Sequence, residues 1–222
     1  MPTSKVSAVT FLSEDVFELV LERDGVIFRP GDCFAIANPS GVSRPYSASS
    51  GNKEACLRFI IRRMPNGQVS QWLAARAPGD AVDITLPFGW FRPGHHLDDG
   101  GDPNDQSIFV ATGTGIAPFL SALRSSRNLR PLLCLYGVRR LTDAVGLDYL
   151  RQRCPLRLCV SREQVPSHHH GRVSDLLGEV PIHPRTNYYL CGLDAMIDEV
   201  SQRLERRGVH FTRIHREVFF NA

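Results

Sequence analysis

The sequence predicts a two-domain fold in which an antiparallel β-barrel precedes an α/β domain with a doubly wound parallel sheet. Residues 6–91 consist of short segments in which apolar and polar side chains alternate, separated by turn signals such as Asp24-Gly25. After residue 106 the apolar runs become continuous and are separated by helical or mixed sequence, which is typical of strands buried between helices. Residues 92–105, rich in Gly, Pro, Asp and His, divide the two patterns. We therefore expect domains at residues 1–98 and 106–222.

The expected elements follow from these two patterns. Segments such as 17–22 and 57–62 alternate like barrel strands, and one helix-like segment, residues 69–76, follows Asn66-Gly67. In the second half, residues 107–111, 131–136, 156–160 and 188–191 are predicted to be buried parallel strands. Ligands of doubly wound sheets bind at the carboxyl ends of the strands, so the residues after these runs are the first candidates for a site.

Composition excludes several classes of function. The chain has 222 residues and a formal net charge of +3, which is too small to make nucleic acid an expected partner. No apolar run reaches the about 18 residues that indicate a membrane span, and the amino terminus lacks the pattern of an export signal. We expect a monomeric, cytoplasmic protein without a membrane span.

No metal site is expected. Most of the six cysteines lie in apolar, strand-like stretches, where a free cysteine behaves as a small hydrophobic residue. Cys154 and Cys159 have the spacing of part of a plant-type iron-sulfur loop, but the further cysteine three positions later is absent. His168-His169-His170 are adjacent on a predicted loop and cannot all face one ion.

A glycine-rich turn, residues 112–118, follows the first buried strand of the second half and precedes a helical run. Glycines allow the backbone to approach a phosphate, and the start of a helix stabilises negative charge. The turn is therefore a candidate phosphate site, with a tight turn that binds nothing as the alternative.

Two candidate sites lie in the first half. Arg44-Pro45-Tyr46-Ser47 combines a guanidinium suited to a pyrophosphate, a stacking ring and a hydroxyl, so it is a candidate flavin clamp. The alternative is a solvated Arg beside an edge-strand Tyr. Gly67-Gln68-Val69-Ser70 precedes the helix-like segment and is a second candidate phosphate site, for which a serine helix cap is the alternative.

The ordered motifs resemble those of the ferredoxin-NADP reductase family over essentially the whole chain. In sequence order they are Arg44-Pro45-Tyr46-Ser47, Gly67-Gln68-Val69-Ser70, Pro87-Phe88-Gly89, residues 113–118 and Cys191-Gly192. The resemblance implies an FAD-binding β-barrel domain followed by an NADP-binding α/β domain, in agreement with the two sequence patterns.

The resemblance also implies roles for individual residues. Arg44 would contact the FAD pyrophosphate, Tyr46 would pack on the isoalloxazine, Ser47 would hydrogen-bond near flavin N5, and Ser70 would hold the pyrophosphate. The residues next to the reacting atoms would be Ser47, Cys191 and Glu217. The cofactor-binding set implied in the two domains is Arg44, Pro45, Tyr46, Ser47, Gly67, Val69 and Ser70 in the first, and Thr112, Gly113, Thr114, Gly115, Pro118, Cys191 and Gly192 in the second.

Residues after the third buried strand favour NADPH over NADH. Ser161 and Arg162 supply the hydroxyl and cation that a 2'-phosphate requires, and Arg172 is a second cation. The segment looks like the Ser-Arg-Glu-Gln of NADP-selecting relatives. Glu163 argues the other way, because a carboxylate commonly holds an unphosphorylated ribose.

The carboxyl end carries a candidate lid. Relatives end in a Glu followed by an aromatic residue that covers the flavin, and Phe219 or Phe220 after Glu217 would take that place. Two residues follow Phe220 and neither candidate is Tyr or Trp. A phenylalanine at a strand end is also ordinary core material, so both interpretations stay open.

The expected function is transfer of a hydride from NADPH to FAD, followed by single electrons to a separate ferredoxin or flavodoxin-type carrier. No cluster domain is evident in the sequence. The alternatives are an NAD(P)H-dependent reductase component of an oxygenase, a free-flavin reductase, and a non-turnover flavin-binding subunit of a larger complex. The reductase interpretation requires the segment around Tyr46 and the turn at Gly113 to face one crevice.

Overall fold

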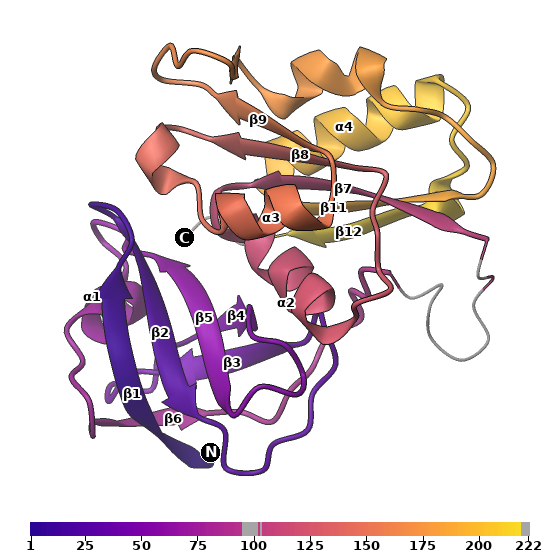
Figure 1. Cartoon of the computed structure of the whole chain (residues 1–222). Helices are drawn as coiled ribbons and strands as arrows, with labels where there is room; N and C mark the ends of the chain where they lie inside the picture. Colours follow the sequence, from indigo (N-terminus) through magenta and orange to yellow (C-terminus); the bar gives the residue numbers. More distant parts are fainter. Residues whose placement is uncertain (95–101, 103, 219–222) are drawn as a thin grey trace. The chain divides into compact units, whose positions relative to one another are not determined.

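The computed structural model describes residues 1–94, 102 and 104–218 of the chain (Figure 1). It divides into two compact units. The first comprises Met1–Arg92 and Ala117–Ser125, and the second comprises Pro93–Ile116 and Ser126–Ala222. Each unit contains one six-stranded sheet.

The first unit is an antiparallel barrel, as the sequence predicts. The ends of the strand order β4-β3-β6-β1-β2-β5 are joined by a bridge between Ala48 and Phe59, which closes the sheet. All pairings between its strands are antiparallel. The strands are β1 (Thr3–Phe11), β2 (Val16–Glu22), β3 (Cys33–Ala37), β4 (Ser43–Ser47), β5 (Cys56–Arg62) and β6 (Ala81–Ile84).

Aromatic side chains fill the barrel because alternate strand residues point inward. Phe17, Phe34 and Phe59 are fully buried, and the Phe34 and Phe59 rings meet edge to face at 5.6 Å between centroids. Helix α1 (Gln68–Ala74) buries Val69 and Leu73 in the same core. The predicted helix-like segment is thus confirmed, starting one residue earlier than expected.

Helix α2 (Ala117–Ser125) is hydrogen-bonded to the barrel segment that follows β4. The Ser121 hydroxyl donates to the Ser50 carbonyl at 2.7 Å, and the Arg124 guanidinium donates to the Ser49 carbonyl at 2.7 Å. A helix from the second half of the sequence therefore groups with the first unit. The predicted domain boundaries, 1–98 and 106–222, stay predictions.

The second unit contains a wholly parallel sheet of order β10-β9-β8-β7-β11-β12. Helices α3 and α4 lie on opposite faces of it (Figure 1), which confirms the doubly wound arrangement. The strands are β7 (Gln106–Thr112), β8 (Leu133–Val138), β9 (Leu156–Val160), β10 (His169–His170), β11 (Thr186–Gly192) and β12 (Ile214–Val218). The helical elements are η2 (Gly113–Ile116), η3 (Leu141–Asp143), α3 (Leu147–Arg153), η4 (Val173–Glu179), α4 (Asp194–Arg206) and η5 (Phe211–Arg213).

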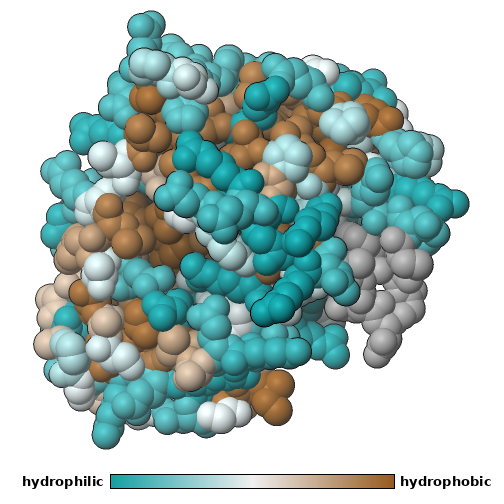
Figure 2. Space-filling view, viewed as in Figure 1, coloured by the Kyte–Doolittle hydropathy of each residue, from teal (hydrophilic) through white to brown (hydrophobic). Residues whose placement is uncertain are grey.

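The surface is mixed in polarity, and Figure 2 shows hydrophobic residues among hydrophilic ones on the visible face. Some large apolar side chains are exposed, including Ile27 and Trp90 in the first unit and Phe211 in the second. Such single exposed residues are common in globular proteins. Within the described residues, none of the helices has the length and apolar character needed to cross a membrane.

Candidate functional site

The carboxyl ends of β7 and β11 form the centre of the site in the second unit. The two strands pair in parallel, with Cys191 opposite Ala111. A β-carbon on Gly192 would collide with the Thr112 side chain, and one on Gly115 would collide with the Cys191 carbonyl oxygen. The glycines are therefore required because Gly192 lies against the Thr112 side chain and Gly115 lies against the Cys191 backbone. The structure brings together the glycine turn and the Cys-Gly motif that the sequence places about 80 residues apart.

Gly113 leaves open space above the turn. Its φ is +53°, a left-handed conformation that favours glycine, and a β-carbon there would have no heavy atom within 4 Å. The turn continues as η2 and then α2, in which Pro118 is buried. Backbone N–H groups at a helix start attract anions. The turn therefore fits the phosphates of a nucleotide, with Thr114 on the same 3-10 segment.

Tyr136 is a part of the turn that the sequence analysis did not identify. This residue is fully buried on β8, and its hydroxyl donates to the Gly113 carbonyl at 3.1 Å. The same oxygen accepts from the Val145 N–H at 3.2 Å. Tyr136 therefore fixes the first peptide of the glycine turn. Its only signal in the sequence is a hydroxyl inside an otherwise apolar run.

Glu217 lies beside the same strand end. In the parallel pairing of β11 with β12, Glu217 is opposite Cys191 and Val218 is opposite Gly192. Cys191 is fully buried and Glu217 is half-buried. The two residues expected beside the nicotinamide are thus neighbours across the sheet. Phe219 and Phe220, the candidate lid, lie outside the described residues.

The Arg-Pro-Tyr-Ser motif occupies β4 in the first unit. Arg44 is exposed and donates to the Ser43 carbonyl at 2.9 Å, and Pro45 faces Ala35 on β3. Tyr46 is half-buried, and burial raises the pKa of its phenol, so the hydroxyl stays protonated at neutral pH. A charged group and an aromatic side chain close together on one strand fit the pyrophosphate and ring of a flavin.

Ser47 lies deeper than the other members of the motif. It is 2% exposed, and its hydroxyl lies 3.3 Å from the Cys33 thiol on β3. Either group can donate in this contact. Cys33 is therefore a neighbour of the candidate flavin site that the sequence indicated only as core.

The Ser70 hydroxyl makes hydrogen bonds within the turn that precedes α1. It accepts from the Met64 N–H at 3.1 Å and donates to the Gly67 carbonyl at 3.4 Å. A β-carbon on Gly67 would collide with this hydroxyl, and Val69 is buried beneath it. Both bonds join Ser70 to the turn before α1, whereas a capping hydroxyl would accept from an N–H at the start of the helix. A role for Ser70 or Gly67 at the FAD pyrophosphate stays a prediction.

Ser161 and Arg162 extend the parallel pairing beyond β8 and β9. The Ser161 N–H donates to the Val138 carbonyl at 3.0 Å, and the Arg162 N–H donates to the Arg139 carbonyl at 2.9 Å. Both Ser161 and Arg162 are exposed. Two adjacent strand ends thus bring a hydroxyl and arginines to one edge of the sheet, as a phosphate site requires.

Arg172 starts η4 after β10 and is also exposed. Its backbone N–H donates to the Asp175 carboxylate at 2.7 Å. This hydrogen bond is the main cause that lowers the pKa of Asp175. A contact of the Arg172 side chain with a 2'-phosphate stays a prediction.

The Glu163 side chain is hydrogen-bonded to a backbone N–H group of another loop. Its carboxylate accepts from the Leu141 N–H at 2.5 Å, at the start of η3. Its carbonyl lies 3.0 Å from Nδ1 of His170. This carboxylate, a candidate ribose ligand in the sequence analysis, is therefore already hydrogen-bonded to a neighbouring loop.

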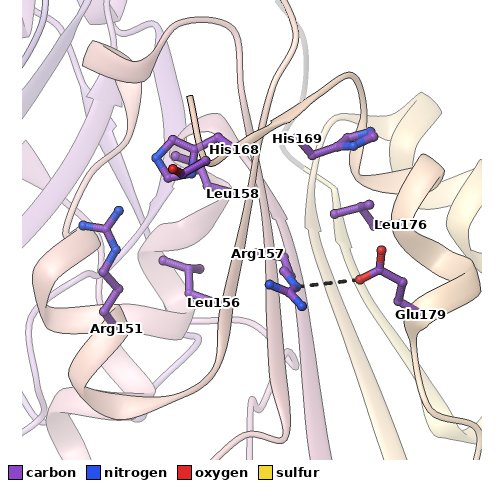
Figure 3. A pocket seen from close by; sticks show the side chains of 9 residues that line it. Arg151, Leu156, Arg157, Leu158, His168, His169, Leu176 and Glu179 are labelled. Atoms are coloured by element: carbon purple, nitrogen blue, oxygen red, sulfur yellow. Dashed lines mark ion pairs between the residues drawn. The ribbon is translucent and has the colours of Figure 1, made fainter. Parts of the chain in front are cut away.

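His169 and His170 have different hydrogen-bonding partners. His170 is next to the Glu163 carbonyl, and Nε2 of His169 lies 3.4 Å from the Asp175 carboxylate. His168 and His169 line a groove of about 400 Å³ with Arg151, Leu156, Leu158 and the ion pair of Arg157 with Glu179, at 3.7 Å (Figure 3). Among the described residues, no group of three His, Cys, Asp or Glu is placed to hold a metal ion.

The six cysteines are free thiols, and five of them are buried. Cys159 is fully buried, and burial raises its pKa to about 12, with a smaller effect from Asp175 and Glu179. A thiol that stays protonated is a poor nucleophile. Cys159 therefore fits a packing role.

Two family models match the chain, one in each half. The oxidoreductase FAD-binding domain matches residues 4–92, and the oxidoreductase NAD-binding domain matches residues 109–202. The first match contains the Arg44 motif, and the second contains the glycine turn and the Cys-Gly motif. Each match thus covers the half in which the corresponding candidate site lies.

Similar proteins come from oxygenase systems. The toluate 1,2-dioxygenase electron transfer component of Pseudomonas putida is 30% identical over 96% of this chain and 66% of its own. The aromatic O-demethylase reductase subunit of an Amycolatopsis species is 30% identical over 99% of this chain and 70% of its own. The chain therefore spans about two thirds of the length of these relatives.

Solved structures share the fold. An Amycolatopsis cytochrome P450 reductase superposes with a TM-score of 0.86 at 28% identity, over 98% of this chain and 69% of that one. A Neisseria gonorrhoeae ferredoxin NADP+ reductase with bound FAD and NADP superposes with a TM-score of 0.85 at 21% identity, over 99% and 98%. The two matching domains, together with the 30% identical reductase subunit of which this chain covers 70%, establish that the chain belongs to the ferredoxin-NADP reductase family of FAD-dependent NAD(P)H oxidoreductases.

Proposed function

We propose that this chain takes a hydride from NADPH onto bound FAD and delivers the electrons singly to a separate protein of an oxygenase system. The observation that carries the proposal is the meeting of Thr112 and Gly115 with Cys191 and Gly192 at one sheet edge, in a chain that also has the Arg44 motif on its barrel. FAD, when bound, accepts electrons as a pair and can release them one at a time.

The chain's own residues bind and orient the flavin and the nicotinamide nucleotide. In the proposal, Arg44 neutralises the FAD pyrophosphate, Tyr46 packs against the isoalloxazine, and the Ser47 hydroxyl donates a hydrogen bond near N5. The Gly113 turn holds the nucleotide phosphates. Cys191 and Glu217 flank the nicotinamide and exclude water from the reacting face, which favours hydride transfer by proximity.

The hydrogen bonds of Glu163 support NADPH as the donor. A carboxylate that accepts from the Leu141 N–H is less able to accept from ribose hydroxyls. Ser161 and Arg162 remain exposed at the same edge. Arg172 completes the proposed 2'-phosphate site. NADH is the weaker donor in this proposal.

The acceptor is inferred from the relatives. Two relatives at 30% identity are a dioxygenase electron transfer component and an aromatic O-demethylase reductase subunit, which favours an oxygenase component or its ferredoxin over a flavodoxin or free flavin. Reduced buried thiols also fit a cytoplasmic location.

Anaerobic addition of NADPH to the FAD-loaded protein tests the proposal. The flavin band near 450 nm should bleach within seconds, and a purified ferredoxin should then be reduced. Bleaching with transfer only to added free FMN would assign the free-flavin reductase alternative. Intact FAD that does not bleach with NADPH or NADH would assign the non-turnover subunit and overturn the proposal.

A further inference from the structure

Three segments of the second unit meet at Glu163. Its carboxylate accepts the Leu141 N–H from the loop after β8, and its backbone carbonyl contacts His170 of β10. Glu163 itself follows Ser161 and Arg162 at the end of β9. One residue therefore links the segments that follow β8 and β9 to strand β10.

The Leu141 N–H requires such a partner. It is the first N–H of η3, and the residue before it, Arg140, makes no side-chain cap hydrogen bond. An N–H at a helix start has no partner within the helix. A carboxylate at this position accepts that hydrogen bond, and a charged acceptor makes it stronger.

The hydrogen bond fixes the separation of two arginine-bearing loops. Arg139 and Arg140 immediately precede Leu141, and Arg162 immediately precedes Glu163. The backbones of Arg139 and Arg162 are joined by a 2.9 Å hydrogen bond. The hydrogen bond between Leu141 and the Glu163 carboxylate is a second link between the same loops. Glu163 is one residue beyond Arg162, and Leu141 is two residues beyond Arg139.

We propose that Glu163 is a positioning residue for nucleotide selection: it holds the loop after β8 against Ser161 and Arg162, so that cationic side chains from both loops surround the 2'-phosphate. This inference rests on the proposed use of NADPH. In this role the Glu163 carboxylate hydrogen-bonds to the protein and not to the nucleotide. This explains why an acidic residue lies beside a site that must attract an anion.

The substitutions Glu163→Gln and Glu163→Ala test this role, since glutamine can still accept from the Leu141 N–H and alanine cannot. The probe is adenosine 2',5'-bisphosphate, with 5'-AMP as the counterpart that lacks the 2'-phosphate, and binding is measured by calorimetry on the FAD-loaded protein. Glu163→Ala should weaken binding of the bisphosphate about tenfold and leave that of 5'-AMP within about twofold. Glu163→Gln should restore binding to within about threefold of the wild type.

Other outcomes overturn the inference. If both variants bind the bisphosphate more tightly, Glu163 acts only by repulsion; if both weaken 5'-AMP and NADH, it is a ribose ligand. Glu179→Ala is the matched control, because it removes a surface carboxylate paired with Arg157 at 3.7 Å. Nucleotide binding by the wild type is measured without turnover, so failure of the reductase assay is distinguished from failure of this inference.

Discussion

Gly192 contacts Thr112 so closely that a β-carbon on Gly192 would collide with the threonine side chain and approach its backbone. Gly192 also has a φ of +140°, which L side chains rarely adopt. We expect Gly192→Ala to lower the free energy of unfolding by ~2–4 kcal/mol, measured by urea denaturation. Gly178→Ala is the control, since a β-carbon there meets nothing within 4 Å and should change stability by less than ~0.5 kcal/mol. Equal effects would contradict the contact.

The hydrogen bond of Tyr136 to the glycine turn predicts that its loss weakens both stability and NADPH binding, whereas loss of a similar bond elsewhere weakens stability alone. Tyr136→Phe should leave the Gly113 carbonyl without its partner, cost ~1–2 kcal/mol of stability and raise the KM for NADPH several-fold. Tyr188→Phe is the matched control, because Tyr188 is also buried and donates to the Pro181 carbonyl at 2.7 Å. It should lower stability without changing KM. A KM effect of similar size in both variants would remove the role of Tyr136 in the turn.

The exposed guanidinium of Arg44 predicts weak retention of flavin in Arg44→Ala. Loss of its charge-assisted hydrogen bonds to the pyrophosphate should weaken FAD binding by ~10–100-fold, so the protein should purify largely colourless. The ratio of absorbance at 450 nm to that at 280 nm measures this. Arg76→Ala, which breaks a surface ion pair with Asp80 at 3.4 Å, should stay yellow. Full flavin content in Arg44→Ala would rule out the clamp.

The exposed Arg162 predicts a selective kinetic effect. Arg162→Ala should raise the KM for NADPH by ~10–100-fold and change the KM for NADH by less than about threefold. Steady-state assays with both nucleotides and one artificial acceptor measure the difference. Arg151→Ala, on the groove of Figure 3, should affect neither. An equal rise for both nucleotides would show that Arg162 does not select the phosphate.

Cys159 predicts loss of stability at alkaline pH. Burial raises its pKa to about 12 in the folded chain, against about 8.5 in an unfolded one. The folded state therefore binds the proton more tightly, and this stabilisation is complete below pH ~8.5 and is lost as the pH rises toward 12. The difference in unfolding free energy between wild type and Cys159→Ala should shrink by up to ~1.4 kcal/mol per pH unit above 8.5. Val160→Ala, which truncates a buried side chain without an ionisable group on the same strand, should show no such trend. A difference independent of pH would contradict the shift.

The fold class of each half could be predicted from the sequence because it follows from local hydrophobic patterns. Alternation of side chains in residues 17–22 and 57–62, and continuous apolar runs later, reflect one covered face in a barrel and two in a parallel sheet. The structure confirms both. The grouping of α2 with the barrel was not predictable, because it depends on hydrogen bonds between Ser121 and Ser50, which lie 71 positions apart.

The sequence by itself determined the fold class, the family motifs and the places where glycine is needed. Only the tertiary structure decided which atoms those motifs face: Gly192 against Thr112, the Tyr136 hydroxyl on Gly113, and the Glu163 carboxylate on Leu141. The reason is physical. Periodicity follows from how neighbouring residues share one element, whereas the partner of a hydrogen bond or a backbone contact is chosen when distant strands take their register.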